Sequence, residues 1–579
     1  MPSPAAAPPP ADPSAAGAEQ DLRAALKLGA ARQTLPVALV HASRHPDHLG
    51  IHLALAELAE AACRPAEQRT AIDHAIGLCR RRLAAAPRDW PLHETLARLH
   101  YRRGAFAEAW SAFSRLHRHQ PADAAALLGL VKCGLPLARW EGLGALHANL
   151  IPPLVAEGTA TASNLIALPI PGTAPALLAA GRIESQRLAA GLDPSPPRRI
   201  AADSPLRIGY VSPDFNDHAV AHQVPRVFEL HDRARVRVHA YDIGHDDGSP
   251  YRRRVLAACD VVRDCRRLDD ASAAALIAAD GIDILVDLAG HTVGSRLGIF
   301  AWRPAPLQVA WLGYPATTGA AFIDYLVADP IVAPPAQRAH FSEALIHLPD
   351  CYLPADDRQS IAPGATRAAA GFPERSIVLA ALHQPYKLEP EIFDTWLRIL
   401  GRVPGAVLWL RAKDDAMQAR LRDLAAESGV DPRRLIIDNL LLPKPEYLAR
   451  LALADVFLDT RYFNGHSTVS DALWAGVPVV TTPGDAFAGR VAASILAASG
   501  LGGLVAPDLA AYEELVVRLA SSSSDLDTAK ARVAHARQHG RFFDAARFTV
   551  HLETAYASIA AHHRTGRPPA DLAVPATTR

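Results

Sequence analysis

The sequence predicts an α/β fold in which two doubly wound Rossmann-like lobes follow an all-α, tetratricopeptide-like superhelical region. Up to about residue 190 the chain is rich in Ala, Leu and Arg, and its apolar residues recur at helical spacing. From residue 206 onward, short strand-like runs alternate with helical segments, which is the pattern of parallel sheets covered on both faces. An irregular stretch at 351–372 divides these runs into two sets, so we expect two lobes with a cleft between them.

Composition limits the classes of protein that this chain can be. With 579 residues it is too long for a single hydrophobic core, and its 60 Lys and Arg residues balance 60 Asp and Glu residues. This balance argues against general binding to nucleic acid or to a membrane surface, so we expect neither as a partner. The six cysteines form no CxxC pair and have no metal-ligand spacing, which indicates a reduced, cytoplasmic protein.

The first twenty residues are expected to be a disordered leader. Residues 1–20 lack both the basic start and the apolar stretch of a signal peptide. Further along, Pro, Gly or a charged residue interrupts each apolar run before it reaches the length of a membrane helix. We therefore expect the chain to stay in water.

Residues 21–190 are predicted to form a helical region built on the tetratricopeptide pattern. Pro87 and Pro121 lie 34 residues apart, and Ala109 and Phe113 precede the second proline at the spacing of that pattern. Small residues at such positions let paired helices touch, and the proline ends the unit. The fit is partial, because histidines stand where the pattern prefers Trp and Tyr, so an unrelated helical bundle is the alternative.

The rest of the chain divides by composition. We expect a linker at 191–205, a first lobe at 206–350, a connection at 351–372, a second lobe with a closing helix at 373–560, and a disordered tail at 561–579. The predicted strands are 207–212, 236–243, 283–288, 307–312, 325–328, 377–382, 406–410, 435–437, 456–458 and 477–481. Ligands bind outside the carboxyl ends of such strands, which is where we look for chemistry.

The strongest candidate site is the run 464–478, which begins just after a predicted strand. Ser467 or Thr468 can cap a helix there, and the free amides and positive dipole of a helix start suit a diphosphate. Asp471 lies about one turn into this helix, where its carboxylate can reach sugar hydroxyls. An ordinary capped helix leading to a buried strand is the alternative.

Two further loops of the second lobe carry candidate residues. Gln384 and Lys387 follow the first strand of that lobe, where a lysine can neutralise charge on a departing diphosphate and Gln384 can bond a base or phosphate. A later loop carries Tyr447, which can stack on a nucleobase, between the positive charges of Lys444 and Arg450. A surface loop and an amphipathic helix start explain the two loops nearly as well.

In the first lobe, two histidines follow strands. His218 comes after the first strand, and His291 with Thr292 comes after the strand at 283–288. A lone histidine is usually structural, but two at strand ends aimed at one cleft strengthen the case for a site. The glycine-rich turn at 313–319 can also line the cleft, although a tight turn alone explains its glycines.

Several common sites are missing from the sequence. No GxGxxG follows the first strand of the first lobe, and neither a P-loop nor a GxSxG elbow is present, which argues against nicotinamide enzymes, NTPases and hydrolases. The only Asp-x-Asp near the nucleotide motifs, at 525–527, follows a serine run away from any strand end. We therefore expect no metal or other cofactor.

Several long motifs, taken in order, are specific. They are RIGYVSPDF with His218, the run FAWRPAPLQVAWLGYPATTG, the Gln384/Lys387 pair, Pro443–Lys444, and NGHSTVSDALWAGVPVVTTPG. From Leu206 to about Tyr556 the chain resembles the protein O-GlcNAc transferase family, and the helical region in front agrees with it. It looks like a bacterial homologue with few repeats and no long insertion between the lobes.

The resemblance implies a GT-B fold and an inverting, metal-independent transfer of N-acetylglucosamine from UDP-GlcNAc to Ser or Thr hydroxyls. The acceptors would be proteins or peptides bound along the helical repeats. Carried over by motif, the diphosphate would contact Lys387, Ser467 and Thr468, with His466 beside it. The ribose would contact Asp471, and the uridine would be surrounded by Gln384, Lys444, Tyr447 and Arg450. His218 matches a histidine proposed as the base, a role disputed within the family, and Tyr447 stands where animal members carry His.

Three alternatives remain at this stage. The same fold serves other donors, such as the GDP-fucose used by related plant proteins. A sugar-nucleotide epimerase has a similar architecture but does not need a helical region that presents peptides. A non-enzymatic repeat scaffold is the third alternative, and the intact Lys387 and Asp471 argue against it.

Overall fold

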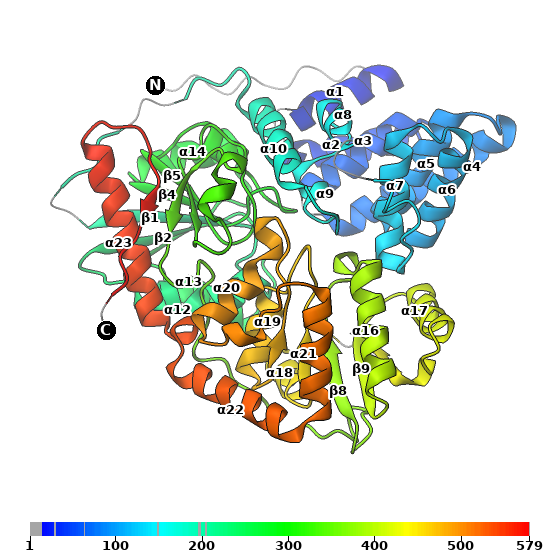
Figure 1. The fold of residues 1–579 in the computed structure, drawn as a ribbon. Coiled ribbons are helices and arrows are strands. Elements are labelled where there is room, and N and C mark those ends of the chain that lie inside the picture. Colours follow the sequence, from blue (N-terminus) through cyan, green and yellow to red (C-terminus); the bar gives the residue numbers. More distant parts are fainter. Residues whose placement is uncertain are drawn as a thin grey trace. The chain divides into compact units, whose positions relative to one another are not determined.

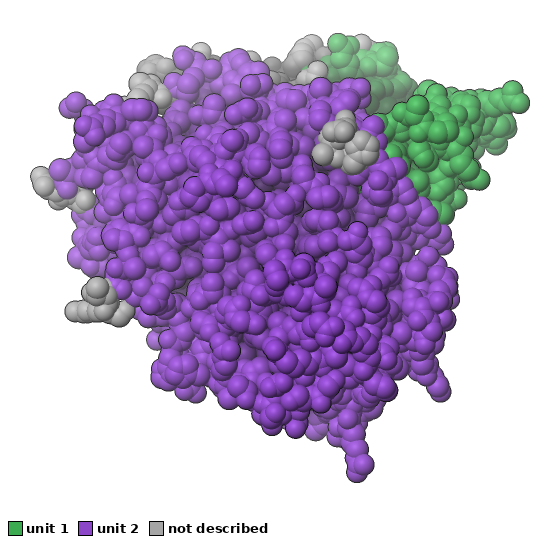
Figure 2. Space-filling view, viewed as in Figure 1, with its two compact units in different colours: residues 1–133, 267–270 green, residues 134–266, 271–579 purple. Residues whose placement is uncertain are grey.

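The computed structural model describes residues 14–27, 31–62, 64–146, 150–194, 198–202, 205–439 and 441–577. It divides into two compact units, shown in green and purple in Figure 2. Unit 1 comprises residues 1–133 and 267–270, and unit 2 comprises residues 134–266 and 271–579.

Unit 1 is helical. Its helices are α1 (Ala15–Lys27), α2 (Ala31–Arg44), α3 (Leu49–Ala61), α4 (Pro65–Ala85), α5 (Trp90–Arg103) and α6 (Phe106–His119), followed by α7 (Ala124–Gly134). The pair α5–α6 fills the predicted repeat between Pro87 and Pro121. Asp89 caps α5 by accepting from the Leu92 amide at 3.0 Å, and Gly104 ends it with φ 79°, a conformation that glycine adopts without strain.

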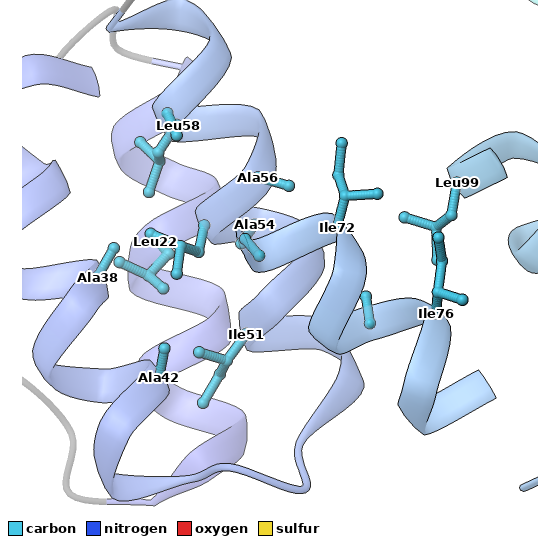
Figure 3. Packing of buried hydrophobic residues seen from close by; sticks show 14 of the residues in the cluster. Leu22, Ala38, Ala42, Ile51, Ala54, Ala56, Leu58, Ile72, Ile76 and Leu99 are labelled. Atoms are coloured by element: carbon cyan, nitrogen blue, oxygen red, sulfur yellow. The ribbon is translucent and has the colours of Figure 1, made fainter. Parts of the chain in front are cut away.

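The core of unit 1 joins α1 to the helices that follow it (Figure 3). Leu22 of α1 is buried with Ala38, Ile51 and Leu58, and the alanines among these residues let the helices approach closely. The predicted leader is therefore wrong from Ala15 onward, because this stretch buries an apolar face in the core. Residues 1–13 of the leader lie outside the described residues.

The first lobe of unit 2 is built on an eight-stranded parallel sheet with the order β13-β7-β6-β5-β4-β1-β2-β3. The strands are β1 (Leu206–Ser212), β2 (Val236–Asp242), β3 (Val261–Asp264), β4 (Ile284–Asp287), β5 (Leu307–Ala310), β6 (Tyr325–Ala328), β7 (Ala344–His347) and β13 (Leu572–Ala573). The helices of this lobe are α11 (Ala219–Gln223), α12 (Pro225–Leu230), α13 (Pro250–Ala257), α14 (Asp270–Ala279) and α15 (Gly298–Ala301). In the middle of the sheet, Ile208 of β1 pairs with Val238 on one side and Ile284 on the other.

The second lobe has a five-stranded parallel sheet with the order β10-β9-β8-β11-β12. Its strands are β8 (Ile377–Ala381), β9 (Ala406–Arg411), β10 (Leu435–Asp438), β11 (Val456–Leu458) and β12 (Val479–Val480). The helices are α16 (Pro390–Arg402), α17 (Asp415–Glu427), α18 (Lys444–Leu451), α19 (Ser467–Trp474), α20 (Val491–Ala498), α21 (Leu509–Ser521) and α22 (Ser523–His539). The prediction of two parallel α/β lobes that follow a helical region in the sequence is confirmed (Figure 1).

Every predicted strand exists, but β3, β7 and β13 were not predicted. β3 alternates exposed and half-buried residues and ends in charged ones, so it lacks the apolar run that marks the central strands. β13 is a two-residue strand at the sheet edge, too short for any periodicity to reveal.

The last helices of the predicted helical region belong to unit 2. These are α8 (Ile151–Ala156), α9 (Ala162–Leu165) and α10 (Ala174–Ala189). α10 lies so close to the first lobe that a Cβ on Gly181 would come within 2.5 Å of the Thr318 carbonyl oxygen. Ser185 of the same helix donates to this carbonyl at 3.3 Å. Only a glycine permits this approach, and it fixes α10 against the turn at 313–319.

The C-terminal segment packs on the first lobe. α23 (Ala545–Arg564) was predicted to close the second lobe, but its Glu553 accepts from His231 Nδ1 at 3.0 Å and from the Asp232 amide at 2.8 Å. The tail predicted to be disordered from 561 is also ordered in part, because β13 pairs with β7 and Asp571 accepts from the Leu345 amide at 2.8 Å. Both predictions are wrong for the same reason: a free sheet edge and a buried partner lie hundreds of residues earlier in the chain.

The described ranges contain free thiols, but neither a membrane-spanning helix nor a cluster of metal ligands. The cysteines in these ranges, Cys79, Cys133, Cys259, Cys265 and Cys351, are free thiols. None of the described helices combines the length and the apolar character that crossing a membrane requires. Over the same ranges, no three His, Cys, Asp or Glu side chains come together as a group of metal ligands.

Candidate active site

The order of the second sheet brings two predicted motifs together. β11 pairs with β8, so the loops that leave their carboxyl ends are neighbours. The loop after β8 forms the short 3₁₀ helix η3 (Pro385–Lys387), and the loop after β11 leads into α19. Lys387 Nζ donates to the Asn464 carbonyl oxygen at 2.8 Å and lies 3.9 Å from the centre of the Phe463 ring. A cation is thereby held beside the loop that enters α19.

A buried carboxylate holds the loop between β11 and α19 in place. Asp459, at the end of β11, accepts from the Gly465 amide at 2.7 Å and from Thr481 Oγ1 at 2.6 Å. Gly465 has no room for a side chain, because a Cβ there would lie 2.4 Å from Thr468 Oγ1. The path of the loop therefore depends on a glycine and a buried aspartate.

The start of α19 lacks a side-chain cap. His466 occupies the N-cap position, and the first amide that bonds back to its carbonyl is that of Ser470, at 3.1 Å. The amides before it are the ones that every helix leaves unpaired. Thr468 Oγ1 is buried and has no hydrogen-bond partner among the described residues. Unpaired amides, a hydroxyl and the nearby Lys387 ammonium together form a site suited to an anion.

Burial sets the charge of the groups around this site. It lowers the pKa of Lys387 to about 8, against the opposing effect of Asp459. Burial raises the pKa of Asp459 to about 7. Burial, assisted by the charge of Lys387, lowers the pKa of His466 and of His383 to about 3. Both imidazoles are therefore neutral near pH 7, and Lys387 is the group that carries the positive charge.

Lys444 and Asp471 form a close ion pair at one side of the site. Lys444 is the first residue of α18, and its Nζ donates to both carboxylate oxygens of Asp471 at 2.6 Å. Their side chains are only 10% and 7% exposed. The Tyr447 ring centre lies 5.7 Å from the same ammonium, and burial strongly raises the pKa of Tyr447. These three predicted residues are thus gathered in one place.

A narrow pocket between the lobes joins this pair to the first lobe. Its lining includes Lys444, Ser467 and Asp471 from the second lobe, and His222 and Gln223 from the first. His222 was not among the predicted residues. Its Nε2 shares a hydrogen bond with Asp217 Oδ1 at 2.7 Å, and burial, together with the charge of Lys444, lowers its pKa. The available signal was its place one helical turn after His218.

The two predicted histidines of the first lobe have different surroundings from those expected. His218 is the N-cap of α11, accepts from the Val220 amide at 3.3 Å, and is 49% exposed. His291 bonds through Nε2 to the Thr318 carbonyl at 2.7 Å and has Nδ1 3.4 Å from Glu184 of α10. Burial lowers the pKa of His291, but the bonds to Glu184 and Thr318 outweigh it and the pKa is raised.

Neither His291 nor Thr292 lines the pocket. Thr292 Oγ1 donates to the Ala289 carbonyl at 2.8 Å, and the His291 ring is held between α10 and the turn at 313–319. His291 thus contacts α10, which no sequence pattern connects to this strand end. The assignment of His291 and Thr292 to substrate binding stays a prediction.

Gln384 and Arg450, the remaining predicted residues, differ in their exposure and contacts. Gln384 is exposed at the start of η3, next to the Lys387 turn. Arg450 is engaged elsewhere: its Nη2 donates to Asp438 at 2.8 Å and to the Ala370 carbonyl at 3.0 Å, and its guanidinium lies 5.3 Å from the Trp409 ring centre. These contacts make Arg450 a support of the lobe connection.

Comparison with known proteins gives consistent matches. The family described as glycosyl transferase family 41 matches residues 194–363 and 356–552. A curated relative from Arabidopsis thaliana, probable UDP-N-acetylglucosamine–peptide N-acetylglucosaminyltransferase SEC, is 40% identical over 382 residues, or 65% of this chain and 39% of that protein. The UDP-N-acetylglucosamine–peptide N-acetylglucosaminyltransferase of Caenorhabditis elegans is 29% identical over 476 residues, or 63% of this chain and 41% of that protein. The chain thus spans about two fifths of the length of these relatives.

A solved structure agrees with the fold. A mutant of the Thermobaculum terrenum O-GlcNAc transferase superposes with a TM-score of 0.70 at 29% identity, over 89% of this chain and 99% of that chain. The match extends beyond the two lobes into the helical region. It confirms the predicted GT-B fold with helices in front.

Proposed function

We propose that this chain, which belongs to glycosyl transferase family 41, moves N-acetylglucosamine from UDP-N-acetylglucosamine to Ser or Thr hydroxyls of proteins. The observation that carries the proposal is the placement of Lys387 beside the uncapped start of α19, a combination suited to a diphosphate. The names of the relatives from A. thaliana and C. elegans support the donor and the peptide acceptor.

The proposed reaction inverts the anomeric carbon. The acceptor oxygen attacks that carbon from the face opposite UDP, the bond from carbon to the diphosphate oxygen breaks, and the electron pair leaves with UDP. Negative charge then grows on the diphosphate, so the Lys387 ammonium and the α19 amides stabilise the transition state more than the ground state. We assign the positive charge to these groups and propose no metal.

The other roles follow from position. We propose that Asp471 holds the ribose, that Lys444, Tyr447 and Gln384 surround the uracil, and that His466, Ser467 and Thr468 contact the phosphates. The common pocket of Lys444, Ser467 and Asp471 supports this arrangement. His218, on the exposed rim of α11, is proposed to orient the acceptor while its proton leaves late in the reaction.

We propose a cytoplasmic location, with protein or peptide acceptors held along the helical region. The free thiols in the described ranges support a reducing compartment. The balanced charge of the whole chain supports neither nucleic acid nor a membrane as a general partner.

The test is transfer of labelled sugar. The purified chain is incubated with radiolabelled UDP-N-acetylglucosamine and a cell lysate, and label is counted separately on protein and as free sugar. We expect label on protein that β-elimination releases and that EDTA does not diminish. Parallel reactions use GDP-fucose. If protein is labelled from GDP-fucose and not from UDP-N-acetylglucosamine, the proposed donor is wrong. If label appears only as free sugar, the proposed protein acceptor is wrong.

The rate should also fall as pH rises above about 8. Because burial lowers the pKa of Lys387 to about 8, the ammonium is present below that pH and lost above it. The profile of kcat/KM against pH reports ionisations of the free enzyme, so its basic limb should lie there. In Lys387→Arg the guanidinium stays charged, and the basic limb should move to higher pH even if the rate is lower. An unchanged basic limb in this variant would assign it to another group.

A further inference from the structure

A groove on unit 1 contains none of the residues assigned to the proposed transfer site. It lies among α4, α5 and α6, has a volume of about 550 Å³, and is open to solvent. Its apolar lining includes Leu83, Leu96 and Ala112, each at most 9% exposed. Arg80 of α4 and Arg115 of α6 also line it. The groove therefore combines an apolar floor with two cationic side chains.

The surroundings of the groove are strongly basic, although the chain as a whole is neutral. Residues 80–119 contain nine arginines and three carboxylates. Neighbouring arginines are paired: Arg102 with Glu60 and Arg103 with Asp73. Within the described ranges, neither Arg80 nor Arg115 forms an ion pair with a carboxylate, and Glu108 is the one acidic residue that lines the groove. Two guanidinium groups are thus available to a ligand.

Two lining residues depart from the repeat pattern. His93 and His100 stand where that pattern prefers Trp and Tyr, and both line the groove. His100 is 7% exposed, and its Nδ1 has no hydrogen-bond partner among the described residues. Burial, together with the charge of Arg80, lowers the pKa of His100, so the ring is neutral. Polar atoms therefore replace part of an apolar helix contact at this point.

We propose that this groove binds an acidic, extended polypeptide segment of the acceptor protein, with carboxylates on Arg80 and Arg115 and an apolar side chain on the floor. Arginine binds carboxylates in a planar, bidentate way, and this favours a peptide rich in Asp and Glu. The apolar floor favours a peptide over nucleic acid, whose phosphate backbone would leave it uncovered. That the bound polypeptide is an acceptor rests on the proposed function, whereas peptide binding by the groove does not depend on it.

Such docking would select substrates by a segment apart from the glycosylated Ser or Thr. A protein held at one site on the chain reaches the transfer site at a raised effective concentration, without any new contact there. The groove would thus add specificity for acidic proteins to the proposed transfer.

The test is fluorescence anisotropy on the full chain with a labelled peptide of alternating Glu and Asp around a central Leu. We expect binding by the parent and at least about tenfold weaker binding by the double variant Arg80→Glu/Arg115→Glu. The matched control is Arg69→Glu/Arg118→Glu, which changes the charge equally on exposed positions of the same two helices outside the groove. This control should bind within about twofold of the parent. Circular dichroism checks that both variants fold.

The outcomes separate the possibilities. If both variants lose peptide binding equally, the binding depends on general charge and not on the groove, and the proposal is overturned. The proposal is also overturned if an oligonucleotide binds the parent more tightly than the peptide does and only the groove variant loses that binding. A second assay compares labelling of a Ser-containing peptide with and without the acidic segment. If the peptide binds but no peptide is ever labelled, docking stands and the proposed transfer fails. If the parent labels the two peptides equally, and the groove variant labels them as fast as the parent does, the transfer stands and docking fails.

Discussion

Replacing Lys387 by alanine is expected to slow transfer by a factor of about 10² to 10³, equivalent to about 2.7 to 4 kcal/mol of barrier, as for loss of one oxyanion donor. The reason is the placement of its Nζ, 2.8 Å from the Asn464 carbonyl at the entry to α19, where diphosphate charge would grow. Because that charge is greater in the transition state than in the bound UDP-sugar, kcat should fall more than the affinity for the intact UDP-sugar.

Steady-state kinetics give the rate, and calorimetry with UDP-N-acetylglucosamine in the absence of acceptor gives the affinity. Lys413→Ala is the control, because Lys413 is exposed in the loop after β9 and should leave both unchanged. A turnover of Lys387→Ala within about tenfold of the parent would be too large for loss of an oxyanion donor and would remove Lys387 from its role. A fall in the affinity for UDP-sugar with kcat unchanged would make Lys387 a binding residue only.

Replacing Asp471 by alanine is expected to have two large effects. It leaves the Lys444 ammonium, only 10% exposed, without its carboxylate, and breaking a buried pair in this way costs about 3 to 5 kcal/mol of unfolding free energy. It also removes the carboxylate proposed to hold the ribose, so UDP uptake should be lost. Chemical denaturation measures the first effect and calorimetry the second.

A second variant separates these effects. Lys444→Met/Asp471→Leu replaces both charges by apolar groups of similar size, which is often neutral for stability. This variant should unfold near the parent's midpoint and still bind no UDP. Recovery of UDP binding together with stability would show that the pair only supports the fold. Glu514→Ala serves as contrast: Glu514 is 67% exposed in its pair with Arg402, and an exposed pair contributes about 0 to 1 kcal/mol.

Much of this protein could be predicted from its sequence. The alternation of apolar runs with helical segments located every strand except β3, β7 and β13, and the run at 464–478 marked the start of α19. These features depend on local periodicity and on capping residues, which act over a few positions of the chain. The ends of the molecule were harder, since β13 and α23 are stabilised by partners in the first lobe.

The site residues also divide into what local sequence predicts and what distant contacts decide. The sequence by itself determined which loops carry polar groups at strand ends, because a parallel sheet exposes its functional loops there. Only the tertiary structure decided which of those groups meet. The pairing of β8 with β11 brings Lys387 to Asn464 across 77 residues, whereas α10 draws His291 to Glu184 and Asp438 engages Arg450. Strand order and helix packing set such contacts, and both depend on burial between segments far apart in the chain.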